Sequence, residues 1–142
     1  MARQAEAEWK GDLKGGTGRV KLGSGAYEGN YSFATRFENG KGANPEELIG
    51  AALAGCFSMA LANSLAQAGF TATSVHTKAD VHLGKDDIGF LINLIELDVT
   101  ATVPKVDRAT FDQHLEKTKI GCIIKRALSA VPTINVKATL KN

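Results

Sequence analysis

Short strands separated by glycine-rich turns are predicted for the first 40 residues. A modest alternation of apolar and polar positions predicts strands at residues 6–9, 18–22 and 31–37. The segments GDLKGG and GSGAYEGN between them have the composition of turns.

The strongest signal along the chain is a long apolar helix. Asn44 is a good N-cap, Pro45 suits the first helical position, and Gly69 ends the pattern. Residues 48–62 are apolar or small on nearly every helical face, so we expect this helix to be buried on all sides. Because a chain of 142 residues rarely encloses so long a helix, we expect a second subunit to cover part of it.

The second half of the chain predicts a mixture of strands and helices. The return strand of the hairpin is apolar on both faces at first and alternates later, which indicates layers on both of its sides. The predicted elements are a hairpin at 75–83 and 90–103, helices at 107–119 and 122–130, and a last strand at 133–140. We therefore expect one α+β domain over residues 1–142.

Composition and charge exclude several functions. The net charge of +2 is small and the basic residues are scattered among acids, so nucleic acid is not an expected partner. The N-terminal segment lacks the apolar core of a secretory signal. No stretch reaches the roughly 18 uninterrupted apolar residues of a membrane span. We therefore expect a cytoplasmic protein without a membrane partner.

The two cysteines are the candidate chemistry. In a reducing compartment they are either small core residues or redox groups, rather than a structural disulfide. Cys56 lies within the apolar helix, where burial raises a thiol's pKa, so a reactive Cys56 would need a cation nearby. Cys122 follows Gly121 at a predicted helix start, and free N–H groups there favour a thiolate. Position alone leaves their roles open.

The three histidines do not form a metal site in this interpretation. His76 and His82 lie on the outer face of one strand, about 20 Å apart at about 3.3 Å per residue, and His114 is expected on an exposed helix face. The sequence has no CxxC or HExxH motif, so we expect neither a metal nor a cofactor.

Three segments give the sequence a family resemblance. WKGDLKGGTG, NPEELIGAALAGCFSMAL and KTKIGCIIKRAL together resemble the OsmC branch of the OsmC/Ohr family, which is named after osmotically inducible protein C. The similarity extends over nearly the whole chain. It implies a bacterial thiol peroxidase that reduces organic and inorganic hydroperoxides, built as an intertwined homodimer with two long central helices packed between antiparallel sheets.

The resemblance also assigns roles to residues. It implies that Cys56 is the peroxidatic cysteine and Cys122 the resolving one, that Arg36 pairs with the Cys56 thiolate, and that Glu47 orients Arg36. Ile123 departs from the pattern, because many relatives carry proline there.

A dimer is also expected from helix geometry. Glu47 and Cys56 are nine residues apart, so at about 100° and 1.5 Å per residue they point to opposite faces. If both serve one centre, we expect Glu47 to come from the partner subunit.

The expected reaction is reduction of a hydroperoxide to alcohol or water through a Cys56 sulfenic acid and a Cys56–Cys122 disulfide, which an external lipoyl-type dithiol or small thiol then reduces. An apolar lining is expected to favour organic peroxides, with Leu53, Phe57 and Met59 as candidate substrate contacts. The alternatives are a non-catalytic dimeric module that binds small ligands, and a thiol redox sensor.

Overall fold

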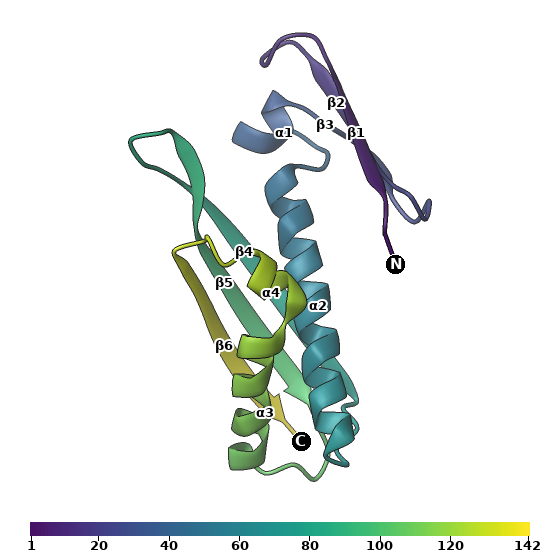
Figure 1. Cartoon of the computed structure of the whole chain (residues 1–142), viewed down its shortest axis with the longest axis vertical. Coiled ribbons are helices and arrows are strands. Elements are labelled where there is room, and N and C mark those ends of the chain that lie inside the picture. Colours follow the sequence, from purple (N-terminus) through teal and green to yellow (C-terminus); the bar gives the residue numbers. More distant parts are fainter. The chain divides into compact units, whose positions relative to one another are not determined.

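The computed structural model describes residues 1–142 and has the α+β composition expected from the sequence (Figure 1). The chain divides into two compact units, residues 1–48 and residues 49–142, and each is described by itself.

The first unit is a small antiparallel sheet followed by one short helix. Its strands are β1 (Ala5–Lys10), β2 (Thr17–Leu22) and β3 (Glu28–Tyr31), in that order across the sheet. The rings of Trp9 and Tyr31 lie with their centroids 5.4 Å apart, on either side of Gly18 in the pairing register. A Cβ at Gly18 would lie 2.4 Å from the Tyr31 ring, so the aromatic contact requires glycine there.

The prediction of a strand at residues 31–37 is wrong beyond its first residue. Helix α1 (Phe33–Phe37) occupies this segment. Ser32 and Thr35 form a capping box, in which the Ser32 hydroxyl accepts from the Thr35 N–H and the Thr35 hydroxyl accepts from the Ser32 N–H. These two local hydrogen bonds satisfy helix-start donors, which the apolar alternation does not reveal.

The second unit is a layer of helices on a three-stranded sheet. Its elements are the main part of α2 (Pro45–Gln67), β4 (Ser74–Lys85), β5 (Phe90–Thr102), α3 (Arg108–Gly121), α4 (Ile123–Ala127) and β6 (Thr133–Lys141). The predicted hairpin, long helix and last strand are therefore present. The sheet order is β4-β5-β6, with β4 antiparallel and β6 parallel to β5, so this sheet is mixed rather than purely antiparallel.

Local signals explain the ends of α2. The side chain of Asn44 accepts a hydrogen bond of 2.8 Å from the N–H of Glu47, as expected of an N-cap. Gly69 has a φ of +89°, the left-handed conformation that commonly follows a helix end.

The core of the second unit is built on one face of α2 and the odd-numbered side chains of β5. Leu53, Phe57, Leu61 and Leu65 repeat every four residues and have no exposed surface. They form one cluster with buried residues of β5 and with Phe111 and Leu115 of α3, so α2 and α3 cover the same face of the sheet.

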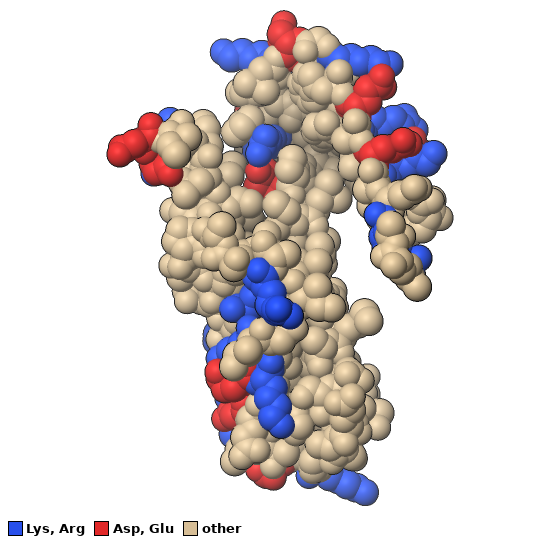
Figure 2. Space-filling view, in the orientation of Figure 1, with Lys and Arg blue, Asp and Glu red and all other residues tan.

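The rest of α2 is open, contrary to the expectation of burial on all sides. Met59 is 76% exposed, and Ala52, Gly55 and Ala66 are exposed with it. No charged residue lies between Glu47 and Lys78, and the right side of the lower half of Figure 2, where α2 runs in Figure 1, is uncharged above a basic side chain at the bottom edge.

By length and mean hydropathy (1.7) α2 also meets the criteria for a membrane span. Core helices meet them too, and the stripe of α2 that packs on the sheet is typical of a core helix.

Candidate functional site

The two cysteines, 66 residues apart in the chain, lie in direct contact. Cys56 is in the middle of α2 and is partly exposed, whereas Cys122 is 1% exposed at the junction of α3 and α4. Both thiols are free, and the Cys122 thiol donates a hydrogen bond to the Cys56 sulfur over 3.4 Å. A disulfide needs about 2.05 Å, so closing the bond requires a movement of about 1.4 Å.

The position of Cys122 follows from the way one helix ends and the next begins. Its N–H donates to the carbonyl of Thr118 and closes α3, while its carbonyl accepts from the N–H of Arg126 and starts α4, both at 2.9 Å. Gly121, which lies between the two predicted helices, is the last residue of α3. Cys122 itself is the turning point, with ψ near 119°. Ile123 is the first residue of α4.

The surroundings make Cys56 the more acidic of the two thiols. Burial raises the pKa of the Cys56 thiol, but this is outweighed by the N–H of Ile124, the thiol of Cys122 and the N–H of Ile123, so its pKa lies below the ordinary value. Burial raises the pKa of Cys122, and the neighbouring Cys56 sulfur raises it further against the opposing N–H groups of Lys125 and Ile124. The pair therefore has one acidic and one less acidic thiol.

This arrangement corrects one expectation. The N–H groups at the start of α4 do favour a thiolate, but the thiolate is that of Cys56 rather than that of Cys122. The lowered pKa of Cys56 comes from hydrogen-bond donors within the second unit.

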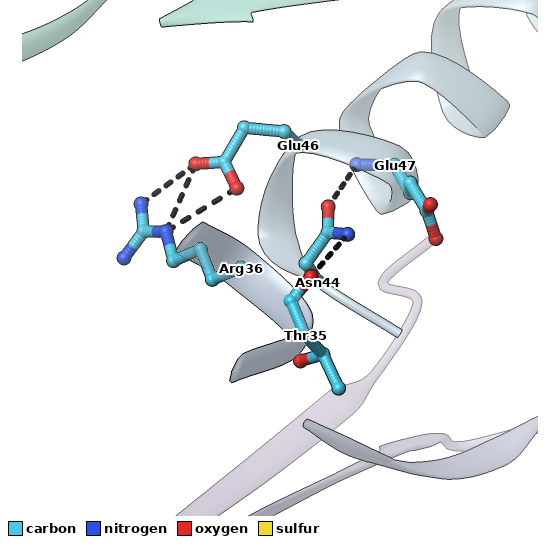
Figure 3. A network of polar contacts seen from close by, with 5 residues as sticks. All are labelled: Thr35, Arg36, Asn44, Glu46 and Glu47. Carbon is cyan, nitrogen blue, oxygen red and sulfur yellow. Dashed lines mark hydrogen bonds and ion pairs between the residues drawn. The ribbon is translucent and has the colours of Figure 1, made fainter. Parts of the chain in front are cut away.

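Arg36 lies in the first unit, where a carboxylate fixes it. Nη2 donates to Oε1 of Glu46 at 2.7 Å, and Nε donates to Oε1 at 3.1 Å and to Oε2 at 3.2 Å (Figure 3). The Glu46 side chain is 11% exposed and that of Arg36 39%. The second terminal nitrogen of Arg36 takes no part in the pair, so the guanidinium keeps donors for another acceptor.

The carboxylate that holds Arg36 is thus Glu46 and not Glu47. The two residues follow each other in the first turn of α2, so their side chains leave the helix about 100° apart. Figure 3 shows Glu46 directed at Arg36 and Glu47 directed away. The sequence argument that placed Glu47 and Cys56 on opposite faces therefore does not apply to the residue that pairs with Arg36.

A pocket of about 240 Å³ next to Arg36 was not predicted. It is lined by the polar residues Arg36 and Ser32 and by aromatic or apolar residues, which are Trp9, Leu13, Tyr31, Phe33, Phe37 and Pro45. The signal in the sequence was the two phenylalanines around Arg36 in FATRF, which a helix brings to one side.

The three predicted substrate contacts are not brought together. Leu53 and Phe57 point into the core and have no exposed surface, whereas Met59 is on the open face of α2. Leu53 and Phe57 belong to the core cluster against which Cys56 packs, so they offer no surface to a ligand.

The histidines divide into exposed and buried ones. His76 and His82 are exposed on β4, as expected, and His82 bonds Glu96. The expectation that His114 is exposed is wrong, because it is 9% exposed and hydrogen-bonded to Ser64. No group of three metal-ligating side chains is present.

Comparison with known proteins gives consistent matches. The model of the OsmC-like protein family matches residues 38–137. The chain is 49% identical, over 94% of both chains, to a protein named Peroxiredoxin OsmC from Escherichia coli. An organic hydroperoxide resistance protein from Elizabethkingia anophelis is 26% identical, with a TM-score of 0.71 over 100% of this chain and 98% of that one. An OsmC-like protein from Mycoplasma pneumoniae, 19% identical, shares the fold, with a TM-score of 0.76 over 100% and 99%.

Proposed function

We propose that this chain, which belongs to the OsmC-like protein family and is a hydroperoxide-reducing thiol peroxidase, works through Cys56 as the attacking thiolate and Cys122 as the resolving thiol. The observation that carries the assignment of roles is the contact between the two sulfurs at 3.4 Å, in which the pKa of Cys56 is lowered and that of Cys122 raised.

The chemistry follows from these roles. The Cys56 thiolate attacks the terminal oxygen of the hydroperoxide, the O–O bond breaks, and the alcohol or water leaves with a proton. The product is a Cys56 sulfenic acid. The Cys122 sulfur then attacks the oxidised sulfur, a disulfide forms and water leaves. An external thiol reductant restores both thiols, and we propose a dithiol of lipoyl type or a small thiol for this step.

Arg36 is proposed to interact with the Cys56 sulfur and with the oxygen of the hydroperoxide that this sulfur attacks. A guanidinium held by Glu46 on one side and open on the other is suited to bind a thiolate or a developing alkoxide. Arg36 and Glu46 belong to the same unit and are paired there, so we expect Glu46 to be required together with Arg36.

A homodimer is proposed because each unit has surface that a single chain does not cover. The open stripe of α2 is apolar and made mostly of small residues, which allow another helix to approach closely. All members of the buried core cluster belong to the second unit. The first unit has no comparable core, and a sheet of three short strands needs an apolar partner layer.

Organic hydroperoxides are the proposed preferred substrates. The pocket beside Arg36 is lined mainly by aromatic rings and is large enough for a small alkyl or aryl group. An alkyl tail gains from burial there, whereas H2O2 has no apolar part to bury.

The test is thiol titration of the purified, reduced protein with cumene hydroperoxide and, separately, with H2O2. We expect one equivalent of oxidant to consume both thiols, with a Cys56–Cys122 disulfide found by peptide mapping. Cys56→Ser should abolish turnover. Cys122→Ser should permit one oxidation and then accumulate over-oxidised Cys56. Oxidation of the wild type no faster than that of free cysteine would refute the proposal.

A further inference from the structure

A buried polar contact joins the two helices that carry the thiols. The Ser64 hydroxyl on α2 and Nδ1 of His114 on α3 share a hydrogen bond of 2.7 Å. His114 is nine-tenths buried, and the next residue on α3, Leu115, belongs to the apolar core cluster. A polar pair among apolar side chains adds little net stability compared with an apolar pair, so its contribution lies more in fixing one relative position of the helices.

A series of hydrogen bonds continues from this contact to the resolving thiol. The carbonyl of His114 accepts from the Thr118 hydroxyl at 2.8 Å, and Thr118 is itself buried. The carbonyl of Thr118 accepts from the N–H of Cys122 at 2.9 Å. The last turns of α3, which lead to Cys122, are therefore linked through His114 to Ser64.

The Ser64–His114 contact and the Cys56–Cys122 contact lie at equal spacings along the two helices. Ser64 follows Cys56 by eight residues on α2, and His114 precedes Cys122 by eight residues on α3. The helices thus run antiparallel, and the polar contact lies about 12 Å along the axis from the thiol pair at about 1.5 Å per residue. A second fixed point at this distance restricts rotation and sliding of α3 against α2 at the level of the sulfurs.

We propose that Ser64 and His114 are positioning residues for disulfide formation. Their contact holds α3 in the register that keeps the Cys122 sulfur within reach of the Cys56 sulfur. The step concerned is attack of the Cys122 sulfur on the Cys56 sulfenic acid, in which the S–S bond forms, the S–O bond breaks, and the hydroxyl leaves as water with the Cys122 proton. The inference rests on the two-cysteine cycle proposed above.

The test separates oxidation of Cys56 from disulfide formation. Reduced Ser64→Ala protein is mixed rapidly with cumene hydroperoxide, and the loss of the Cys56 thiolate and the appearance of the disulfide are followed as two phases. We expect the first rate constant to stay within about twofold of wild type. The second should fall about fivefold, the equivalent of about 1 kcal/mol for one hydrogen bond. Over-oxidised Cys56, counted by intact mass at excess peroxide, should rise accordingly.

Ser58→Ala is the matched control. Ser58 is also on α2 and its hydroxyl shares a hydrogen bond of 2.8 Å with Thr77, but this contact leads to β4 and not to α3. It should leave both phases unchanged. His114→Asn, whose amide replaces Nδ1, should retain most of the second rate, and His114→Leu should lose it. If His114→Leu does not fold, Ser64→Ala and His114→Asn decide the question.

Two outcomes would overturn the inference. One is a second phase in Ser64→Ala that equals that of Ser58→Ala. The other is an equal fall of both phases, which indicates general loosening of the fold. Failure of the two-cysteine cycle itself is recognised separately, because the wild type would then form no disulfide.

Discussion

Replacing Glu46 or Glu47 by glutamine tests which carboxylate serves Arg36. Glu46→Gln removes the negative charge that receives Nη2 and Nε of Arg36 at 2.7–3.2 Å, and it directs amide hydrogens at a cation. A hydrogen bond between charged groups is worth about 1.5–3 kcal/mol when buried and about 0–1 kcal/mol at the surface. Glu46 is largely buried but Arg36 is more than a third exposed, so we take an intermediate value of about 1.4 kcal/mol for the loss in Glu46→Gln.

This free energy corresponds to about a tenfold fall in kcat/KM for cumene hydroperoxide, measured with a saturating thiol reductant. Glu47→Gln is the control, because both residues are in the first turn of α2 and lose the same favourable interaction with the helix dipole. Its kcat/KM should remain within about twofold of wild type. Equal losses in the two variants, or a larger loss for Glu47→Gln, would refute the assignment of Glu46.

Three further predictions concern the thiols, the core and the assembly. The alkylation rate of Cys56 should rise with pH with a midpoint below that of free cysteine, because the pKa of Cys56 is lowered. Cys122→Ala should move this midpoint to higher pH, because it removes a hydrogen-bond donor to the Cys56 sulfur. An unchanged midpoint in Cys122→Ala would contradict this role of the Cys122 thiol. Leu61→Ala should lower the free energy of unfolding by about 3 kcal/mol in urea at fixed protein concentration, because Leu61 has no exposed surface, and a loss below about 1 kcal/mol would contradict its place in the core. Met59→Glu should shift the protein from dimer to monomer in sedimentation experiments, since it puts a charge on the open face of α2, whereas an unchanged dimer would exclude that face as the interface.

The elements with strong local signals were predictable from the sequence. The cap at Asn44, the left-handed glycine at 69 and the uncharged stretch after Glu47 define α2 within a few residues, because helix ends depend on local hydrogen bonds. The ranges of β4, β5 and β6 were also predicted closely, because side chains in a strand alternate between its two faces and this alternation is visible in the sequence. Helix α1 was missed, because the capping box of Ser32 and Thr35 favours a helix more strongly than the modest apolar alternation favours a strand.

The residue types needed for the chemistry, two thiols and an arginine, can be read from the sequence, and the family resemblance suggested their roles. How these residues are placed relative to one another depends on the three-dimensional structure. Contact between Cys56 and Cys122 depends on α2 and α3 packing on one face of the sheet, a long-range property that no spacing encodes. The choice of Glu46 over Glu47 depends on the direction in which neighbouring side chains leave a helix. The lowered pKa of Cys56 depends on N–H groups brought by another helix, so the acidity of a thiol follows from its three-dimensional neighbours rather than from its neighbours in sequence.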